Sequence, residues 1–341
     1  MQQSEVFTIR NNFLKTDNIK SKKLLGVTEE RKPMVSIVIP TYNRVNTLKN
    51  AVTTALKQED FFDYEIVVVD NDNSENNDVL QFLEGIKSDR ISYYKNEENI
   101  GMVGNWNRGV FLSQGKWVTI LCDDDLLHPK FLKIMMGIID KNINLNFLLS
   151  RYQLFSHAAD LIQKSDEIDV AIETLCHSVN KYELLFGNVN CCIGALLKKE
   201  NVLKIGGFSD ELYPSYDHAF TKLYISEFGG GMVVEKKLAY YNKSLNTSSD
   251  QNVRLKSIEK DHLISKSFIK KEFNNSLIIK RMHETLLMNY FKQIIVDGKM
   301  KDELRMHVFK GKQYPSILKV KIINKIASFL MEPFAKNRSV F

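Results

Sequence analysis

The chain has 341 residues, of which 44% are hydrophobic and 26% are charged, and this ordinary balance excludes a disordered or fibrous protein. The net charge is +6, and residues 270–341 hold 15 Lys and Arg against 6 Asp and Glu, so a basic tail follows a mildly acidic body. The four cysteines form no C-x-x-C pair, no apolar run reaches the length of a membrane span, and the first residues lack a signal-peptide pattern, which together predict reduced thiols in a cytoplasmic protein.

Short apolar runs alternate with amphipathic segments through the first 125 residues. The runs are rich in Val and Ile, which is typical of buried parallel strands. The order β-α-β-α-β-α-β predicts an α/β fold with a mostly parallel, doubly wound sheet that binds its ligand at the carboxyl ends of the strands. The expected strands are residues 34–40, 64–70, 91–95 and 116–122, and the expected helices lie around residues 48–56, 78–87 and 102–113.

The pattern is less regular beyond residue 129. Neither a G-x-G-x-x-G after the first strand nor a P-loop is present, which argues against a dinucleotide fold and a P-loop protein. The expected elements are a helix at 129–140, a strand at 145–155, an irregular segment at 156–180, a short helix at 181–187, a strand at 190–197, a helical turn at 199–204, a helix at 219–228, an edge strand at 232–241, and helices from 261 onward.

Three consecutive aspartates, Asp123, Asp124 and Asp125, directly follow the fourth expected strand. Adjacent like charges repel one another unless a positive charge lies among them. Oxygen ligands suit Mg²⁺ or Mn²⁺, which often bridge a protein to substrate phosphates. The triplet therefore predicts a divalent metal site, and a solvated acidic turn is the alternative.

Four segments occur together in order, and together they resemble the nucleotide-sugar-dependent glycosyltransferases of family 2, which have the GT-A (Rossmann-like) fold. The resemblance covers roughly residues 33–241, about 60% of the chain. The segments are VSIVIPTYNR at 35–44, EIVVVDNDNSENN at 65–77, NIGMVGNWNRGVFLSQGKWVTILCDDDLLHP at 99–129 and IGGFSDELYPSYDHAF at 205–220.

The resemblance implies three parts of the chain. Residues 1–33 are an N-terminal extension, residues 34–245 are the catalytic domain, and residues 246–341 are a basic helical region. Within the catalytic domain, residues 34–128 are the nucleotide-binding half and residues 129–245 the acceptor-binding half.

The resemblance also implies which residues bind the nucleotide sugar. The segment after the first strand would hold the base, with Arg44 beside the phosphates or sugar. Asp70 would accept a hydrogen bond from the base, with Asp72 the weaker candidate. The expected nucleotide-sugar-binding residues are Pro40, Thr41, Tyr42, Asn43, Arg44, Asp70, Asp72, Asn99, Gly101, Asn107, Asp123 and Asp124.

The metal ligands implied by the resemblance are Asp125 and Asp123. Many family members have D-x-D-D here, which would align the first acid with Cys122, so the register within the triplet stays open. Asp125 is expected to be the chief ligand of Mn²⁺ or Mg²⁺, which would stabilise the charge that develops on the leaving diphosphate.

Inverting transfer needs a general base for the acceptor hydroxyl, and the resemblance implies Asp217. The family often has Glu-Asp at this point, whereas Tyr216 precedes Asp217 here. The alternative for Asp217 is a helix N-cap, which is a common role for Asp. His218 is expected to have a structural or acceptor-side role.

The segment 317–331 places Leu318, Ile322, Ile326 and Phe329 on one helical face, with Lys nearby. Such a helix can lie in a membrane interface, and docking on the chain itself or on a second subunit is the alternative. A homo-oligomer is left open. No nucleic-acid recognition motif is present.

The sequence thus predicts an inverting, metal-dependent glycosyltransferase that moves one sugar from a nucleotide-diphosphate sugar, with a UDP-sugar favoured, to a glycan or lipid-linked oligosaccharide. The expected setting is bacterial capsule, exopolysaccharide or lipopolysaccharide synthesis, at or near the inner face of the cell membrane. A sugar-phosphate nucleotidyltransferase and a non-catalytic nucleotide- or glycan-binding module are the alternatives.

Overall fold

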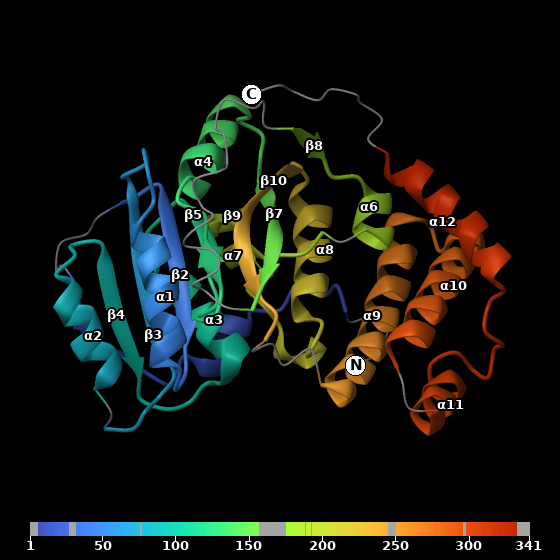
Figure 1. Cartoon of the computed structure of the whole chain (residues 1–341), viewed down its shortest axis with the longest axis horizontal. Helices are drawn as coiled ribbons and strands as arrows, with labels where there is room; N and C mark the ends of the chain where they lie inside the picture. Colours follow the sequence, from blue (N-terminus) through green and yellow to red (C-terminus); the bar gives the residue numbers. More distant parts are fainter. Residues whose placement is uncertain are drawn as a thin grey trace.

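The computed structural model describes residues 6–26, 32–75, 77–156, 175–187, 189–191, 193–244, 250–295 and 298–332. A ten-stranded mixed sheet forms one side of the molecule, and the C-terminal helices lie on the other, at the right of Figure 1. The strand order is β1-β4-β3-β2-β5-β9-β7-β10-β6, and β8 also pairs with β10.

Four neighbouring strands are parallel and form the predicted doubly wound half. Their branched apolar residues are buried on both faces, because helices cover both sides of the sheet. The predicted α/β fold class is confirmed in this region. The strands are β2 (Val35–Thr41), β3 (Tyr64–Asp70), β4 (Ile91–Asn96) and β5 (Trp117–Ile120), and the helices between them are α1 (Val45–Leu56), α2 (Asp78–Ile86) and α3 (Gly101–Leu112).

The other half of the sheet is mixed. β9 is antiparallel to both β5 and β7, whereas β7 and β10 are parallel. The strands are β6 (Leu126–Leu127), β7 (Phe147–Phe155), β8 (Cys176–Ser178), β9 (Ala195–Lys198) and β10 (Gly231–Asn242). Most of the expected irregular segment at 156–180 lies outside the described residues, and β8 is a short strand that the sequence analysis missed.

The prediction of an edge strand at 232–241 is wrong. β10 pairs with β7 and also with β6 and β8, and its two apolar stretches are buried. The charged run Glu235-Lys236-Lys237 coincides with a shift in register against β7. An irregularity in pairing therefore accommodates these charges inside the sheet.

Helices pack around this mixed half and beyond it. α8 starts three residues before the expected position, so Asp217 lies in its first turn, and Ser215 is the N-cap residue. The helices are α4 (Phe131–Lys141), α6 (Lys181–Phe186), α7 (Lys199–Lys204), η3 (Asp210–Leu212), α8 (Tyr216–Phe228), α9 (Gln251–Glu272), α10 (Leu277–Ile294), α11 (Gly298–His307) and α12 (Ile317–Met331).

The C-terminal helices share a small apolar core and pack on the rest of the chain through α8 and α6. α9 begins ten residues before the expected helical region, and Asp250 caps it by accepting the N–H groups of Asn252 and Val253. Among the described helices, none combines the length and the hydropathy that crossing a bilayer would require.

The N-terminal segment was expected to be an extension, yet it joins the sheet and covers α3. β1 (Ser21–Leu25) pairs antiparallel with β4, and η1 (Asn12–Thr16) packs on α3. Arg108 of α3 donates to the carbonyls of Thr16 and Ile19 and to the Ser21 hydroxyl. The Asn12 N–H donates to Gly206 O over 2.9 Å. These contacts make the segment part of the same folded unit.

Substituting Gly206 by Ala is expected to detach this N-terminal segment. Gly206 has φ +81°, and an added Cβ would lie 1.9 Å from Arg10 O. The strained backbone and this clash should cost about 1–3 kcal/mol of unfolding free energy, measured by urea denaturation. Hydrogen exchange should also accelerate in β1.

Gly137→Ala is the matched control, because Gly137 lies in α4 and an added Cβ there meets nothing within 4 Å. This control should be neutral or stabilising by about 0.5–1 kcal/mol. Unchanged exchange in β1 of the Gly206 variant would contradict the proposed attachment.

Candidate functional site

The carboxyl ends of β2 and β5 lie next to each other at one edge of the sheet. Side chains at and after these two ends form hydrogen bonds and ion pairs with one another. Thr41 ends β2, and its hydroxyl donates to Asp123 Oδ2 over 2.8 Å. Arg44 Nη1 lies 3.2 Å from Asp124 Oδ2 and 3.5 Å from Asp123 Oδ1. The structure therefore brings the segment after the first strand together with the aspartate triplet.

The aspartate triplet is largely withdrawn from solvent. The residues Asp123 and Asp125 are 6% and 1% exposed, and Asp124 is half-buried. Burial raises the pKa of Asp123 to about 6 and raises the pKa of Asp125 well above its usual range. Burial also raises the pKa of Asp124, although Arg44 opposes this shift. A solvated acidic turn does not describe these residues.

Two of these carboxylates and a thiol form a group with the dimensions of a metal site. One ligand atom from each of Cys122, Asp124 and Asp125 lies within 4.8 Å of the others. Asp125 Oδ1 is held by the N–H of Asn242, which donates over 2.9 Å. Asp123 is not in this group, and its Oδ2 accepts from the Thr41 hydroxyl instead. The three donors, of which Asp125 is buried and the other two are half-buried, fit a divalent cation, whose charge would offset the cost of ionising them.

The acids at the end of β3 are held by neighbouring donors. Asp70 is 3% exposed, and its two oxygens accept from the Tyr93 hydroxyl and the Asp72 N–H, both at 2.9 Å. Burial raises the pKa of Asp70. Asp72 accepts from the N–H and the hydroxyl of Ser74 at 3.0 and 2.8 Å. Both carboxylates are thus oriented before any ligand arrives.

The segment from Pro40 to Arg44 is exposed only in its second half. Pro40 is buried within β2, and Thr41 is 3% exposed. The Tyr42 side chain is 48% exposed, and Asn43 is exposed with φ +54°. Tyr42 and Asn43 therefore offer more surface to a ligand than Pro40 does, and the contact of Pro40 with a base stays a prediction.

A network of asparagines, which the sequence analysis missed, connects the strand ends. Asn71 donates to Asn99 Oδ1 over 2.7 Å, and Asn96 donates to Asn71 Oδ1 and Asn105 Oδ1 over 3.0 and 2.9 Å. Asn105 donates to Val69 O over 2.9 Å. The accumulation of asparagines just after expected strands was the available signal. We call these four residues, Asn71, Asn96, Asn99 and Asn105, the asparagine network.

The first turn of α3 belongs to the same assembly. Gly101 has φ +74°, is exposed, and donates its N–H to Asn99 Oδ1 over 2.9 Å. Asn107, in contrast, faces away from the strand ends. It is 3% exposed, donates to Phe208 O over 2.9 Å and accepts from Phe208 N over 2.8 Å. The expected nucleotide contact of Asn107 is corrected, because its amide joins α3 to the 205–212 segment.

Asp217 lies in the first turn of α8, half-buried, beside a second charged group. His218 Nδ1 lies 3.0 Å from Asp261 Oδ1, and His218 Nε2 lies 3.3 Å from Asn190 Nδ2. Burial opposes protonation of His218, but the carboxylates of Asp217 and Asp261 outweigh it and raise its pKa. Lys222, one turn further on, is 8% exposed, and burial lowers its pKa. The C-terminal helix α9 thus contributes to the surroundings of Asp217.

A parallel sheet with acidic groups at its strand ends is typical of the GT-A fold. Similarity to known proteins points to the same fold. Residues 36–196 match the family described as Glycosyl transferase family 2. Residues 36–196, a little under half of the chain, thus form a region of this family, and the fold of the chain is GT-A.

Named relatives are similar to only part of this chain. An uncharacterized glycosyltransferase of Haemophilus influenzae is 27% identical over 55% of this chain and 60% of its own length. WcaA of Escherichia coli, provisionally named a colanic acid biosynthesis glycosyl transferase, is 29% identical over 37% of this chain and 40% of its own length. The chain thus spans about half the length of these relatives.

Solved structures share the fold at low sequence identity. S. aureus TarS 1-349 in complex with UDP has a TM-score of 0.52 and 18% identity, over 86% of this chain and 91% of that one. The mannosyltransferase PcManGT from Pyrobaculum calidifontis, in complex with GDP-Man and Mn²⁺, has a TM-score of 0.52 and 13% identity, over 88% of this chain and 81% of that one.

Replacing Asp123 by Asn should stabilise the metal-free protein near neutral pH. The pKa of Asp123 is raised in the folded state to about 6, so folding favours its protonated form. Its contribution to the unfolding free energy therefore falls as pH rises from about 4 through about 6 and stays low above that. Asn resembles the neutral form, and the variant should gain about 1–3 kcal/mol over wild type at pH 7.5 and little at pH 4.5.

The measurement is urea denaturation with a chelator present at several pH values. Asp302→Asn is the matched control, because the Asp302 side chain is 71% exposed. A gain for Asp123→Asn that does not vary with pH would contradict the assignment.

Proposed function

We propose that this glycosyltransferase transfers one sugar from a nucleotide-diphosphate sugar, with a UDP-sugar favoured, to a glycan or lipid-linked oligosaccharide with inversion. The observation that carries the proposal is the meeting of Thr41 and Arg44 with the buried triplet at the strand ends. The UDP and UDP-GlcNAc complexes of TarS, which has the same fold, support a uridine donor.

The nucleotide would lie across the ends of β2 and β3. Tyr42 offers an exposed ring on which a base can stack, and Asp70 lies at the end of the adjoining strand with its carboxylate already oriented. Arg44 is near enough to the triplet to reach a diphosphate as well. Asn99, Gly101 and the Asp72 loop would border the same site.

Asp125 and Asp124 would hold Mn²⁺ or Mg²⁺, with Cys122 beside them. The sequence expectation named Asp123 as the second ligand, whereas we propose Asp124, because Asp124 and not Asp123 lies in the group with Cys122 and Asp125. When bound, the cation would supply electrostatic stabilisation of the leaving diphosphate. Asp123 is then placed to contact a ribose hydroxyl.

Asp217 is the proposed general base. In a single displacement, an acceptor oxygen bonds to the sugar C1 while the C1–O bond to the diphosphate breaks, and Asp217 takes the proton of the acceptor hydroxyl. The helix position of Asp217 supports this role, because the N-cap position belongs to Ser215 and the carboxylate is only half-buried. The named role of WcaA in colanic acid synthesis supports a surface polysaccharide as the setting.

The test is release of nucleoside diphosphate from a panel of nucleotide sugars with Mn²⁺, Mg²⁺ or chelator. One donor should be hydrolysed in a metal-dependent reaction. Asp125→Asn should weaken nucleotide binding and turnover together, because it removes a metal ligand. Asp217→Asn should lower turnover by about 10²–10⁴-fold with UDP affinity unchanged, because a base acts on the acceptor.

Asp302→Asn serves again as the exposed control and should behave as wild type. Turnover that is unchanged by chelator and by the Asp125→Asn substitution would overturn the metal assignment. UDP binding without release from any donor, even with an oligosaccharide acceptor mixture, would favour the non-catalytic binding module.

We further propose that α12 rests on an anionic membrane surface. α12 docks on α10 and α6 through the buried residues Val320, Ile323 and Ala327. The face predicted to be apolar points elsewhere: Leu318, Ile322, Ile326 and Phe329 are 44–72% exposed. Self-docking thus uses a different face of the helix.

The charges of α12 suit such a surface. By helical spacing, the lysines Lys321 and Lys325 flank the exposed apolar stripe on one side, and Lys319 flanks it on the other. Lysines in this arrangement can extend to lipid phosphates while the apolar stripe enters the acyl boundary. The placement of α12 at the outer side of the helical region leaves it accessible (Figure 1).

Co-sedimentation with vesicles should reveal this contact. Binding to vesicles with 30% phosphatidylserine should exceed binding to neutral vesicles, since each lysine near the surface contributes about 1 kcal/mol. The double substitution Ile322→Ser and Phe329→Ser should weaken binding about tenfold or more, because two apolar side chains no longer enter the interface. Ile143→Ser is the control, since Ile143 is 88% exposed but lies in the turn between α4 and β7, far from α12 in sequence. Equal binding by all variants would overturn the proposal.

A further inference from the structure

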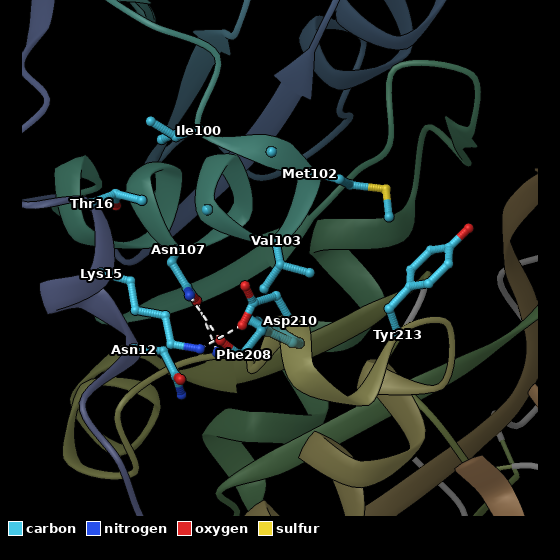
Figure 2. Close-up of a pocket in the computed structure, with 12 residues that line it drawn as sticks. Asn12, Lys15, Thr16, Ile100, Met102, Val103, Asn107, Phe208, Asp210 and Tyr213 are labelled. Carbon is cyan, nitrogen blue, oxygen red and sulfur yellow. Dashed lines mark hydrogen bonds and ion pairs between the residues drawn. The ribbon is translucent and has the colours of Figure 1, made fainter. Parts of the chain in front are cut away.

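A pocket separate from the strand-end site lies beside the first turns of α3, on the side that the N-terminal segment covers. Figure 2 shows it between η1, α3 and the segment that follows Gly207, with a volume of about 300 Å³. This volume is at the small end of the range of roughly 300–1,000 Å³ for ligand pockets, which suits one sugar ring better than a long chain. We call it the η1 pocket, and it is lined by Asn12, Lys15, Thr16, Ile100, Gly101, Met102, Val103, Gly104, Asn107, Phe208, Asp210 and Tyr213.

Ion pairs and hydrogen bonds link the walls of the η1 pocket to one another. Lys15 Nζ lies 2.5 Å from Asp210 Oδ1 and 3.4 Å from Glu211 Oε1, and Arg10 lies 3.1 Å from Glu211 Oε2. Asn12 donates from its amide to Gly206 O over 3.2 Å. Asp210 and Glu211 therefore bind the N-terminal segment through ion pairs. These contacts hold the η1 pocket in a fixed shape within the fold.

The chemistry of the lining suits a carbohydrate. The floor contains apolar side chains of α3 together with Phe208, and the rim carries the Tyr213 ring, which is 41% exposed. The Lys15 and Asp210 side chains are 41% and 62% exposed, so they can also bond to hydroxyl groups. A pyranose has apolar C–H faces and equatorial hydroxyls, and a ring with polar groups beside it matches both.

The η1 pocket adjoins the start of α8. In Figure 2 the Met102 thioether lies toward the Tyr213 ring at the open side of the hollow. The Tyr216 hydroxyl lies 3.5 Å from Met102 Sδ, and the Tyr213 and Tyr216 rings stack at 6.3 Å. Asp217 is the next residue along α8. The η1 pocket therefore borders the end of α8 that carries the proposed base.

We propose that the η1 pocket binds a hexopyranose unit of the acceptor glycan, so that the N-terminal segment takes part in acceptor selection. This inference rests on the proposed glycosyl transfer and names an acceptor subsite for it. Two of its three walls, η1 and residues 208–213, lie outside residues 36–196, the part that matches the family. Half of the lining residues therefore come from outside that part, and the N-terminal segment supplies three of them, Asn12, Lys15 and Thr16.

The test is saturation-transfer NMR with the methyl glycosides of glucose, galactose, mannose and N-acetylglucosamine on the full chain. At least one glycoside should bind. Tyr213→Ala should weaken its binding at least tenfold, and Asp210→Asn should weaken it less, because the exposed ion pair is only one of several polar contacts. Tyr290→Ala is the matched control, since Tyr290 is 55% exposed on α10. Thermal unfolding of each variant verifies that it is folded.

UDP titration by calorimetry separates this inference from the proposed function. Tyr213→Ala should leave the affinity for UDP unchanged. UDP binding with no glycoside bound, or glycoside binding that survives Tyr213→Ala, would overturn the acceptor subsite and leave the transferase proposal standing. A Tyr213→Ala variant that instead raises the donor KM would also overturn it, because the pocket would then hold the donor sugar. Absence of UDP binding would count against the proposed function itself.

Discussion

The asparagine network holds the strand ends in a single arrangement, and the nucleotide side of the site depends on it. Asn71, Asn96 and Asn105 are 3%, 1% and 3% exposed, and each amide donates to or accepts from another member or the strand backbone. Buried polar groups that are fully bonded are rigid, while an unbonded one costs about 1–3 kcal/mol. The network thus fixes the backbone around Val69, Asn71 and Gly101, next to the residues proposed to bind the nucleotide.

The acidic groups of the site are held in place by residues from later in the chain. The N–H of Asn242, the last residue of β10, donates to Asp125, and β10 also pairs with the short strand that follows the triplet. Asp261 of α9 bonds to His218 next to Asp217. The groups proposed for metal binding and proton transfer therefore each have a neighbour that is held by the part of the chain beyond residue 230 or are held by it directly.

The sequence predicted the parallel half of the sheet well, because its strands are short, apolar and buried on both faces. β3 was predicted to the residue, and β4 ends one residue later than expected. The pattern of apolar residues could not predict contacts between residues that are far apart in the sequence. Asn107 bonds to a residue 101 positions away and Asp125 to one 117 positions away, and only the folded chain reveals such partners. β1 escaped prediction for the same reason, since its polar sequence forms a strand only by pairing with β4.

A sulfur atom stands beside the two carboxylates of the proposed metal group, at the position where many relatives of this family carry an acid. Thiolates prefer softer cations, and affinity rises from Mn²⁺ towards Zn²⁺ along the first transition row, whereas Mg²⁺ prefers oxygen. Cys122 therefore makes this group more receptive to contaminating zinc than a site built from oxygen alone. Handling of the protein matters as a result, because traces of zinc in buffers or on affinity resins would compete with Mn²⁺ or Mg²⁺ for the same atoms.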